Sequence, residues 1–207
     1  MGGLLLFVLV TGAAGGAGYL RHGSLQGLGE THVRGRTLAL VCLAVQAVIG
    51  VPFLRTIGLP RAAGAVLLVA ALVTLVGVAR ANGRLPGVPL IALGLLLNLL
   101  VTLANLGVPV SETTLRRANI AVEQPIPRRP DLKHVVEGPA TRIVVLGDRF
   151  AVPPLWTVTS IGEVTELAGL FLLIQHMMLM GAMQGRRDGT APGAHEAKTI
   201  PWSTWAD

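Results

Sequence analysis

Five long runs without Asp, Glu, Lys or Arg divide the chain, and they constrain its fold more than any other feature. These runs lie within residues 2–20, 37–54, 62–79, 85–111 and 167–185. A helix needs about 20 apolar residues to cross the roughly 30 Å hydrocarbon core of a bilayer, so each run is close to that length. We therefore expect an all-α integral membrane protein, with five transmembrane helices in one bundle.

The composition also excludes a typical soluble domain. Hydrophobic residues make up 52% of the 207 and charged residues 14%, whereas a soluble domain averages about 25% charged residues. The net charge is +6, but the basic residues lie singly or in pairs between the apolar runs. That pattern favours a lipid bilayer as partner and disfavours nucleic acid. Cys42 is the single cysteine, so no thiolate metal site is expected, and neither is a cofactor.

Local signals define the helix ends more closely. Pro89 suits the first turn of a helix over residues 88–105, where a missing N–H costs little. Ser160-Ile-Gly-Glu163 matches a capping box, which places the start of the fifth helix at residue 160 and its end near 184. The transmembrane domain is then expected over residues 1–185. The tail 186–207 is rich in Gly, Pro, Ala and Thr, which predicts disorder.

The longest polar segment covers residues 106–156, and we expect it to be structured. Residues 143–146 and 149–152 are apolar runs around Gly147-Asp148, which predicts a small β-hairpin with a tight turn. The Arg residues of the short loops indicate an outer N-terminus and a cytoplasmic C-terminus. The segment 106–156 would then be extracytoplasmic, although it carries six Arg and one Lys.

Several polar residues are candidates for a site. Asn98, Thr102 and Asn105 share one face of the fourth helix, where hydrogen bonds between helices are one interpretation and a polar cavity is the other. Glu163 and Glu166 begin the fifth helix, where they could cap it and favour its dipole, or could form a buried carboxylate site.

His134 and Asp148 lie in the long loop and could form an acid–base or metal-binding pair. The alternative is a surface role for His134 and a turn role for Asp148. No second ligand follows at helical spacing, so no metal site is predicted. We expect Asn105, Glu163 and Glu166 to face each other at the outer membrane boundary. His134 or Asp148 would lie above them, and Arg142 or Arg149 would supply a counter-ion.

Four short motifs resemble a family of small bacterial multi-pass membrane proteins known only as a domain of unknown function. They are RHGSL at residues 21–25, ANLGVPV at 104–110, LGDRFAVP at 146–153 and SIGEV at 160–164. The family usually has Asp where this chain has Glu163, and Gly and Met where it has Leu106 and Val108. The resemblance covers residues 1–184. It implies a bundle in the bacterial cell membrane and implies no activity.

These observations leave three functions open. The first is a non-catalytic membrane protein, either an accessory subunit with a membrane-protein partner or a binder of a lipid or another apolar small molecule. The second is a membrane-embedded enzyme with its site at the outer face of the bundle. The third is a small transporter. These three functions can be distinguished by whether the candidate polar residues converge on one pocket.

Overall fold

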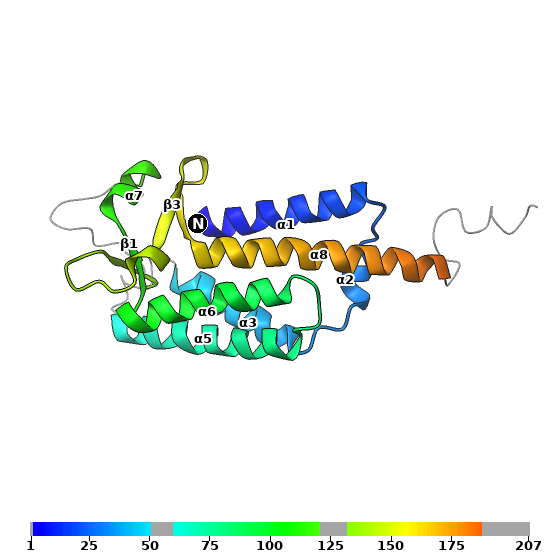
Figure 1. Ribbon diagram of the computed structural model, residues 1–207, viewed down its shortest axis with the longest axis horizontal. Helices are drawn as coiled ribbons and strands as arrows, with labels where there is room; N and C mark the ends of the chain where they lie inside the picture. Colours follow the sequence, from blue (N-terminus) through cyan, green and yellow to red (C-terminus); the bar gives the residue numbers. More distant parts are fainter. Residues whose placement is uncertain (1, 51–59, 121–131, 188–207) are drawn as a thin grey trace, which may run out of the picture.

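The computed structural model describes residues 2–50, 60–120 and 132–187. Most of these residues are helical, and a small β-sheet lies at one end of the molecule (Figure 1). The prediction of a mainly helical protein with a small amount of strand in the long loop is therefore confirmed. Residues 51–54 of the second predicted helix and residues 188–207 of the predicted disordered tail lie outside the described residues.

Four of the described helices are long and apolar enough to cross a membrane. They are α1 (Gly2–Leu20), α5 (Arg61–Ala81), α6 (Val88–Asn105) and α8 (Ile161–Arg187). The helix α3 (Arg36–Ile49) is also apolar, but its 14 residues span only about 21 Å at 1.5 Å per residue. Four candidate spans are thus established, and the predicted fifth span at 37–54 is described as a helix only as far as Ile49.

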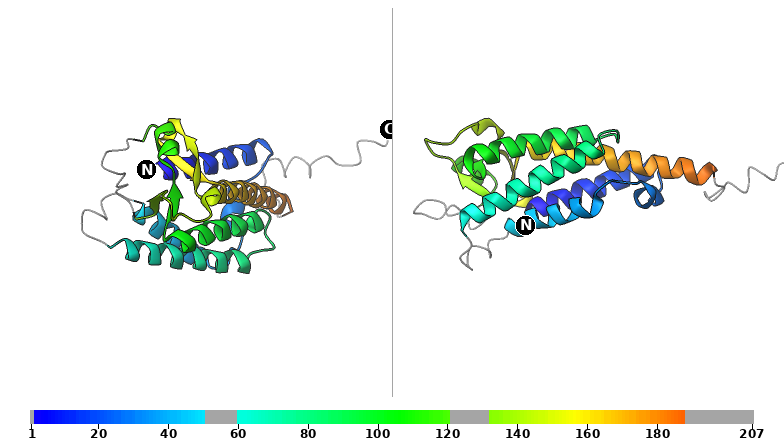
Figure 2. Two further views of the ribbon diagram at one scale, coloured as in Figure 1. Left: turned by 60° about the vertical axis from the view of Figure 1, so that its left-hand side comes forward. Right: turned by 90° about the horizontal axis from the view of Figure 1, so that it is seen from below.

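The long helices pack side by side with α8 at the centre. α1 packs on one side of α8 and α6 on the other, while α5 packs on α6 and α3 packs on α5 (Figures 1 and 2). The main apolar core lies among α3, α5 and α6, and includes the buried side chains of Ile49, Leu68, Leu72 and Leu95. A short helix, α2 (Gln26–Glu30), joins α1 to α3 and packs against α8.

Large apolar side chains cover the outer faces of the helices. Leu40 on α3, Val66 on α5 and Leu103 on α6 are all more than half exposed. A soluble monomer rarely exposes apolar surface on this scale. The outer faces therefore fit a lipid environment.

The sheet has four short strands in the order β2-β1-β3-β4. β1 (Val108–Val110) is parallel to β2 (His134–Val136) and to β3 (Asp148–Val152), and β3 is antiparallel to β4 (Thr157–Ser160). A short helix, α7 (Glu112–Arg117), follows β1. We call the part of the chain over residues 106–120 and 132–160 the cap.

The predicted hairpin was wrong in its register. Residues 144–146 form a 3-10 helix, η1 (Val144–Leu146), and Asp148 starts β3 instead of occupying a turn. The hairpin that forms joins β3 to β4 through a second 3-10 helix, η2 (Pro153–Leu155). Gly147 is needed for packing, because a Cβ there would overlap the carbonyl group of Pro109 on β1. Its backbone is extended, with φ −72° and ψ −175°, so the Gly-Asp pair does not mark a tight turn.

The cap is held over the bundle by continuous chain at both of its ends. β1 follows α6 after Leu106 and Gly107, whose positive φ angles of 54° and 155° end the helix and lead into the strand. At the other end, β4 runs directly into α8. Because α6 and α8 are neighbours, the sheet lies over the end of the bundle where α6 ends and α8 begins (Figure 1). The backbone N–H of Leu132 also donates to the carbonyl of Ile49, at 3.1 Å, which ties the cap to α3.

Candidate functional site

Ser160 and Glu163 form the junction between the cap and α8. The hydroxyl of Ser160 accepts a hydrogen bond from the backbone N–H of Glu163 at 3.0 Å. This bond satisfies one of the free N–H groups in the first turn of α8, as the Ser half of the predicted capping box requires. The Glu163 carboxylate is not used for the other half, because it points to the cap.

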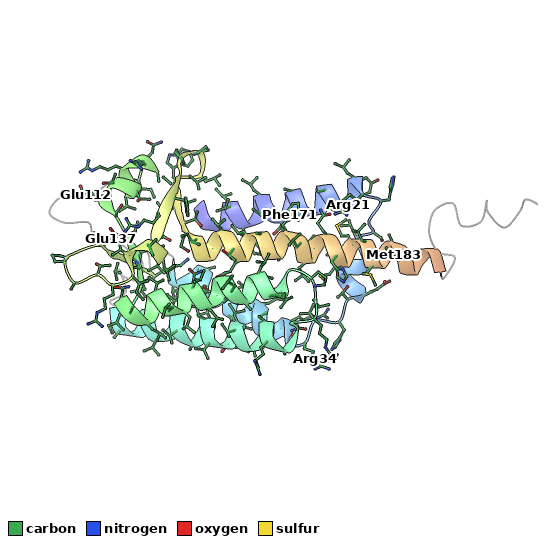
Figure 3. All side chains as sticks on the ribbon, viewed as in Figure 1. Arg21, Arg34, Glu112, Glu137, Phe171 and Met183 are labelled. Atoms are coloured by element: carbon green, nitrogen blue, oxygen red, sulfur yellow. The ribbon has the colours of Figure 1, made fainter. Side chains whose placement is uncertain are left out.

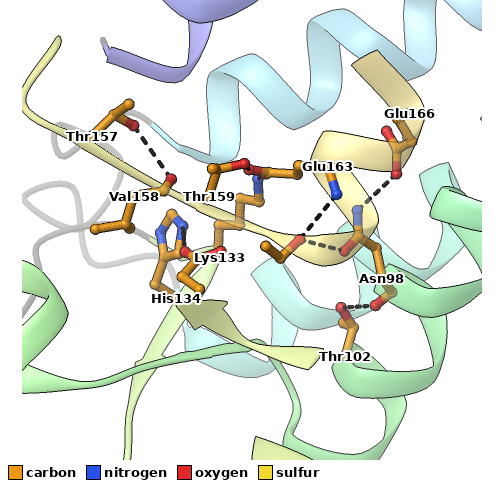
Figure 4. Close-up of polar contacts among 11 residues, drawn as sticks. Asn98, Thr102, Lys133, His134, Thr157, Val158, Thr159, Glu163 and Glu166 are labelled. Atoms are coloured by element: carbon orange, nitrogen blue, oxygen red, sulfur yellow. Dashed lines mark hydrogen bonds and ion pairs between the residues drawn. The ribbon is translucent and has the colours of Figure 1, made fainter. Parts of the chain in front are cut away.

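The Glu163 carboxylate binds two groups of the cap. One oxygen accepts from Lys133 Nζ in an ion pair, and the other accepts from Thr159 Oγ1 at 2.9 Å (Figure 4). The side chains of Lys133 and Glu163 are only 21% and 26% exposed. Burial alone would lower the pKa of Lys133, but the charges of Glu163 and Asp148 and the hydrogen bond to Glu163 outweigh it and raise the pKa. Lys133 is therefore a cation at neutral pH.

Asn98 extends this contact into the bundle. Its side-chain oxygen accepts from Ser160 Oγ at 2.9 Å, and its Nδ2 donates to Glu166 Oε1 at 2.7 Å. The carbonyl of Asn98 accepts from Thr102 Oγ1 at 2.7 Å, so Thr102 bonds within its own helix. Asn98 thus connects the end of β4 to the second turn of α8. We call Asn98, Lys133, Thr159, Ser160, Glu163 and Glu166 the polar cluster.

Two glycines allow α6 and α8 to approach closely enough for these bonds. A Cβ at Gly162 would overlap the side-chain amide of Asn98, and a Cβ at Gly94 would overlap the carbonyl of Gly162 and the side chain of Glu166. Small residues permit such close packing between membrane helices. The amide of Asn98 therefore reaches Ser160 and Glu166 directly.

His134 and Asp148 lie beside the cluster, on the two strands that flank β1. His134 Nε2 and Asp148 Oδ2 are 3.1 Å apart, and their side chains are 13% and 1% exposed. The contact has ion-pair distance but not the alignment of a good hydrogen bond, since neither carboxylate oxygen of Asp148 has a hydrogen-bond partner among the described residues. The predicted pairing of these two residues is thus present in the geometry.

Asn105 is the predicted site residue that the structure does not bring to the carboxylates. Its amide binds the backbone of Arg142, donating to the carbonyl at 2.8 Å and accepting from the N–H at 2.7 Å. Arg142 contributes only its backbone to this contact, and the guanidinium of Arg149 pairs with Glu137 at 2.9 Å. Neither arginine is a counter-ion of Glu163 or Glu166.

Sequence reasoning missed Lys133 as that counter-ion. One signal was available, because Lys133 is one of only two lysines in the chain and directly precedes His134. Asn98 was predicted as a helix–helix contact, but its link to Ser160 depends on the rotation of α6 about its axis. No pattern in the sequence specifies that rotation.

The members of the polar cluster bind one another. The Lys133–Glu163 pair, Thr159, Ser160 and the amide of Asn98 all bond to one another or to Glu166. Glu166 Oε2 is the exception, since no hydrogen bond to it is found within the described ranges. In the same ranges, no group of three or more His, Cys, Asp or Glu side chains is placed to hold a metal ion.

Comparison with protein families gives a match. A protein-family model described as "Family of unknown function (DUF5317)" matches residues 30–175. This range includes the cap and the whole polar cluster. No curated protein and no solved structure matches the chain.

Proposed function

The chain belongs to this family of unknown function, DUF5317, and because membership assigns no activity, we propose a function from the geometry. We infer a non-catalytic membrane protein that acts as an accessory subunit or binds a lipid or another apolar small molecule. The polar cluster is then a clamp that fixes the cap on the bundle.

The observation that carries this proposal is that the members of the polar cluster bind one another. An enzyme site needs a nucleophile, acid or base whose reactive atoms are free to meet a substrate. Here both oxygens of Glu163 are occupied by Lys133 and Thr159, and the Asn98 amide is occupied by Ser160 and Glu166. Two cavities lie at the opposite end of the bundle from the polar cluster. One is lined by residues 32, 34 and 80–85, and the other by residues 29–33 and 35–37. Mutual satisfaction of this kind favours a clamp.

Glu166 favours the second candidate, a membrane-embedded enzyme or a small transporter. Its Oε1 is held by Asn98, but its Oε2 has no hydrogen bond to any described residue. Carboxylates at membrane depth are costly, and they often mark a transport or catalytic path. Glu166 is therefore the residue whose substitution separates the two proposals.

Complementation of a deletion strain that shows a growth phenotype distinguishes the non-catalytic function from an enzyme or transporter. We expect Glu166→Gln to restore growth fully at normal protein levels, because the new amide oxygen can still accept a bond from Asn98. Glu112→Gln, an exposed change on α7, is the matched control. If Glu166→Gln fails at normal levels while the control succeeds, the carboxylate has a chemical role and the non-catalytic proposal is wrong.

Add-back of lipid tests the binding role directly. The full chain is purified in a delipidating neutral detergent, and lipid is returned at increasing mole fraction. A ligand that binds only the folded state raises stability as its concentration rises above its Kd. We expect a saturable rise in the thermal unfolding midpoint. A midpoint that is insensitive to every added lipid would argue against the lipid-binding role.

A further inference from the structure

A basic cavity lies at the end of the bundle opposite the cap. It is an open cavity of about 670 Å³, and its lining comes from the segment before α3, the end of α5 and the connection between α5 and α6: His32, Arg34, Arg80, Ala81, Asn82, Gly83, Arg84 and Leu85. Figure 3 shows Arg34 at this end of the bundle and Glu112 and Glu137 at the other. The cavity uses no residue of the polar cluster, so it is a separate feature of the fold.

Asn82 assembles the cavity from two distant parts of the chain. Its side chain is buried, accepts from the backbone N–H of Arg34 at 2.8 Å, and donates to the carbonyl of Arg34 at 2.8 Å. It also donates to the carbonyl of Val78 in the last turns of α5, at 2.8 Å. The amide therefore holds Arg34 against the end of α5, near Arg80. This part of the cavity wall is fixed by the fold.

The charge of the cavity is unbalanced. Arg34, Arg80 and Arg84 line it without any acidic residue. None of the three guanidinium groups forms an ion pair with a residue in the described parts of the chain, whereas Arg116 and Arg149 at the cap each pair with a glutamate. A smaller cavity that shares His32 is lined by Glu30, but also by Arg36. Like charges gathered in one cavity repel each other, and a bound anion would relieve that repulsion.

The cavity lies at the ends of two candidate membrane spans. The candidate span on α5 ends at Ala81, and the one on α6 begins at Val88. Arg80 and Ala81 end the α5 span, and Asn82 to Leu85 lie between the two spans, where the hydrocarbon core is expected to give way to headgroups. Guanidinium groups bind phosphate through paired hydrogen bonds, and basic pockets between membrane helices bind anionic headgroups.

An exposed apolar stripe leads away from the cavity along α5. Val66, Val73 and Arg80 are seven residues apart, so they lie on one face of the helix, and all three are exposed. A lipid whose phosphate is held at Arg80 could lay an acyl chain along Val73 and Val66. A free phosphate ion would leave this stripe unused.

We propose that this cavity binds the phosphate group of an anionic membrane lipid, with Arg34, Arg80 and Arg84 as its ligands. The inference rests on the proposed function only in taking a lipid as the bound molecule. It adds the chemical class of the lipid and the place where it binds.

The test compares two lipids on the full chain in neutral detergent. Phosphatidylglycerol or phosphatidylcholine is added at equal mole fraction, and bound lipid is counted by native mass spectrometry. The test variant is the triple substitution Arg34→Gln, Arg80→Gln and Arg84→Gln. The control carries the same charge change at the cap, in Arg116→Gln, Arg117→Gln and Arg142→Gln.

We expect wild type and control to bind phosphatidylglycerol in preference to phosphatidylcholine. One basic group near an anionic surface strengthens binding roughly fivefold, so the triple variant should lose on the order of a hundredfold. If the triple variant unfolds in detergent, Arg84→Gln alone should weaken phosphatidylglycerol binding roughly fivefold. If these variants still bind phosphatidylglycerol in full preference to phosphatidylcholine, the proposal is overturned.

The remaining outcomes separate this inference from the proposed function. Equal binding of both lipids by wild type overturns the anionic site but leaves a lipid-binding role intact. No bound lipid of either kind overturns both. Inorganic phosphate is titrated in parallel, and stabilisation by phosphate without any preference between the lipids would show a soluble ligand and overturn the lipid assignment.

Discussion

At the scale of single residues, Glu163 is where the cap and the bundle meet. Its backbone N–H is held by Ser160, and its carboxylate is held by Lys133 and Thr159. Lys133 directly precedes β2, and its carbonyl accepts from the N–H of Val108 on β1 at 2.9 Å. One ion pair thus connects the sheet to the first turn of α8, and loss of either charge leaves the other without its main partner.

The first prediction concerns that ion pair. Lys133→Met should reduce the free energy of unfolding by about 2–4 kcal/mol, because it leaves the Glu163 carboxylate in a largely buried position without its cation. The double variant Lys133→Met, Glu163→Gln should recover most of the loss, since the substituted amide is uncharged and can still accept from Thr159. Chemical denaturation in detergent micelles measures both.

Arg116→Met is the control for this comparison. Arg116 pairs with Glu112 on α7, but its side chain is 63% exposed. Exposed pairs contribute little, so the change should stay within about 0.5 kcal/mol. If the double variant loses as much free energy of unfolding as the two single variants together, the polar cluster does not act as a clamp.

The second prediction is the pH dependence of the same pair. The pKa of Lys133 is raised in the folded protein, after the neighbouring carboxylates outweigh its burial. The stabilisation from this lysine is then complete below its unfolded pKa of about 10.4, and is lost only as the pH rises through the higher folded value. The stability difference between wild type and Lys133→Met should stay constant from about pH 7 to 10 and narrow above that. Narrowing below about pH 9 would mean that Lys133 is not held as described.

At the scale of elements, the contact between α6 and α8 positions every bundle residue of the polar cluster. The two helices approach closely at Gly94 and Gly162, and Asn98 crosses the gap to bond Ser160 and Glu166. The cap depends on the same contact, because β1 leaves α6 and β4 enters α8. A wider separation of these helices would therefore break the cluster and displace the sheet together.

The third prediction tests this contact with matched glycine substitutions. Gly162→Ala places a Cβ on the amide of Asn98, so we expect a loss of about 1–3 kcal/mol from overpacking and broken hydrogen bonds. Gly77→Ala on α5 is the control, because a Cβ there has nothing within 4 Å. It should be neutral, or stabilising by up to about 1 kcal/mol. Equal effects of the two changes on the unfolding midpoint would rule out the close approach as the reason for Gly162.

At the scale of the whole molecule, the long helices alternate in direction between the cap and the basic cavity. α5 runs away from the cap, α6 returns to it, and α8 leaves it again (Figure 1). α3 starts at Arg36, next to the cavities, and ends at Ile49, which bonds Leu132 of the cap. Within the described residues, the four candidate spans and the shorter α3 thus alternate in direction, with α1 starting at the cap end and α8 ending at the other.

The fourth prediction is the membrane topology that follows if all five passes cross the bilayer. A reporter that is active only outside the cytoplasm should be inactive when fused after Gln184. The same reporter should be active when inserted after Gly138, at an exposed position of the cap. Reversed activities would invert the proposed orientation. Activity at both positions would mean that α8, the one candidate span between them among the described residues, does not cross the bilayer.

The positions of the long helices could be predicted from the sequence because the requirement is local. A helix in lipid must satisfy its own backbone and must be apolar over about 20 residues. The ranges of α1 and α6 coincide with those predicted, at 2–20 and 88–105. The hairpin register could not be predicted in this way. Gly147 is required because a Cβ there would overlap the carbonyl of Pro109, which lies on a strand 38 residues earlier in the chain.

Part of the polar cluster was predictable for the same local reason. Glu163 and Glu166 are three residues apart, so one helical face had to carry both, and Ser160 had to precede them as a cap. The choice of partner was a matter of packing. Asn98 and Asn105 lie on the same side of α6, yet only Asn98 lies level with Glu166, while Asn105 binds the backbone of Arg142.

The apolar character of the long helices, their approximate ranges and the start of α8 could be predicted from the sequence alone, because those properties depend on neighbours along the chain. Three contacts depend on how the helices pack: Lys133 binds Glu163, Asn98 binds Glu166, and Arg34 lies with Arg80 and Arg84 around one cavity. Those contacts join residues that are 30, 68 and about 50 positions apart. Such contacts depend on the rotation and separation of packed helices, which are set by how side chains fit together in space.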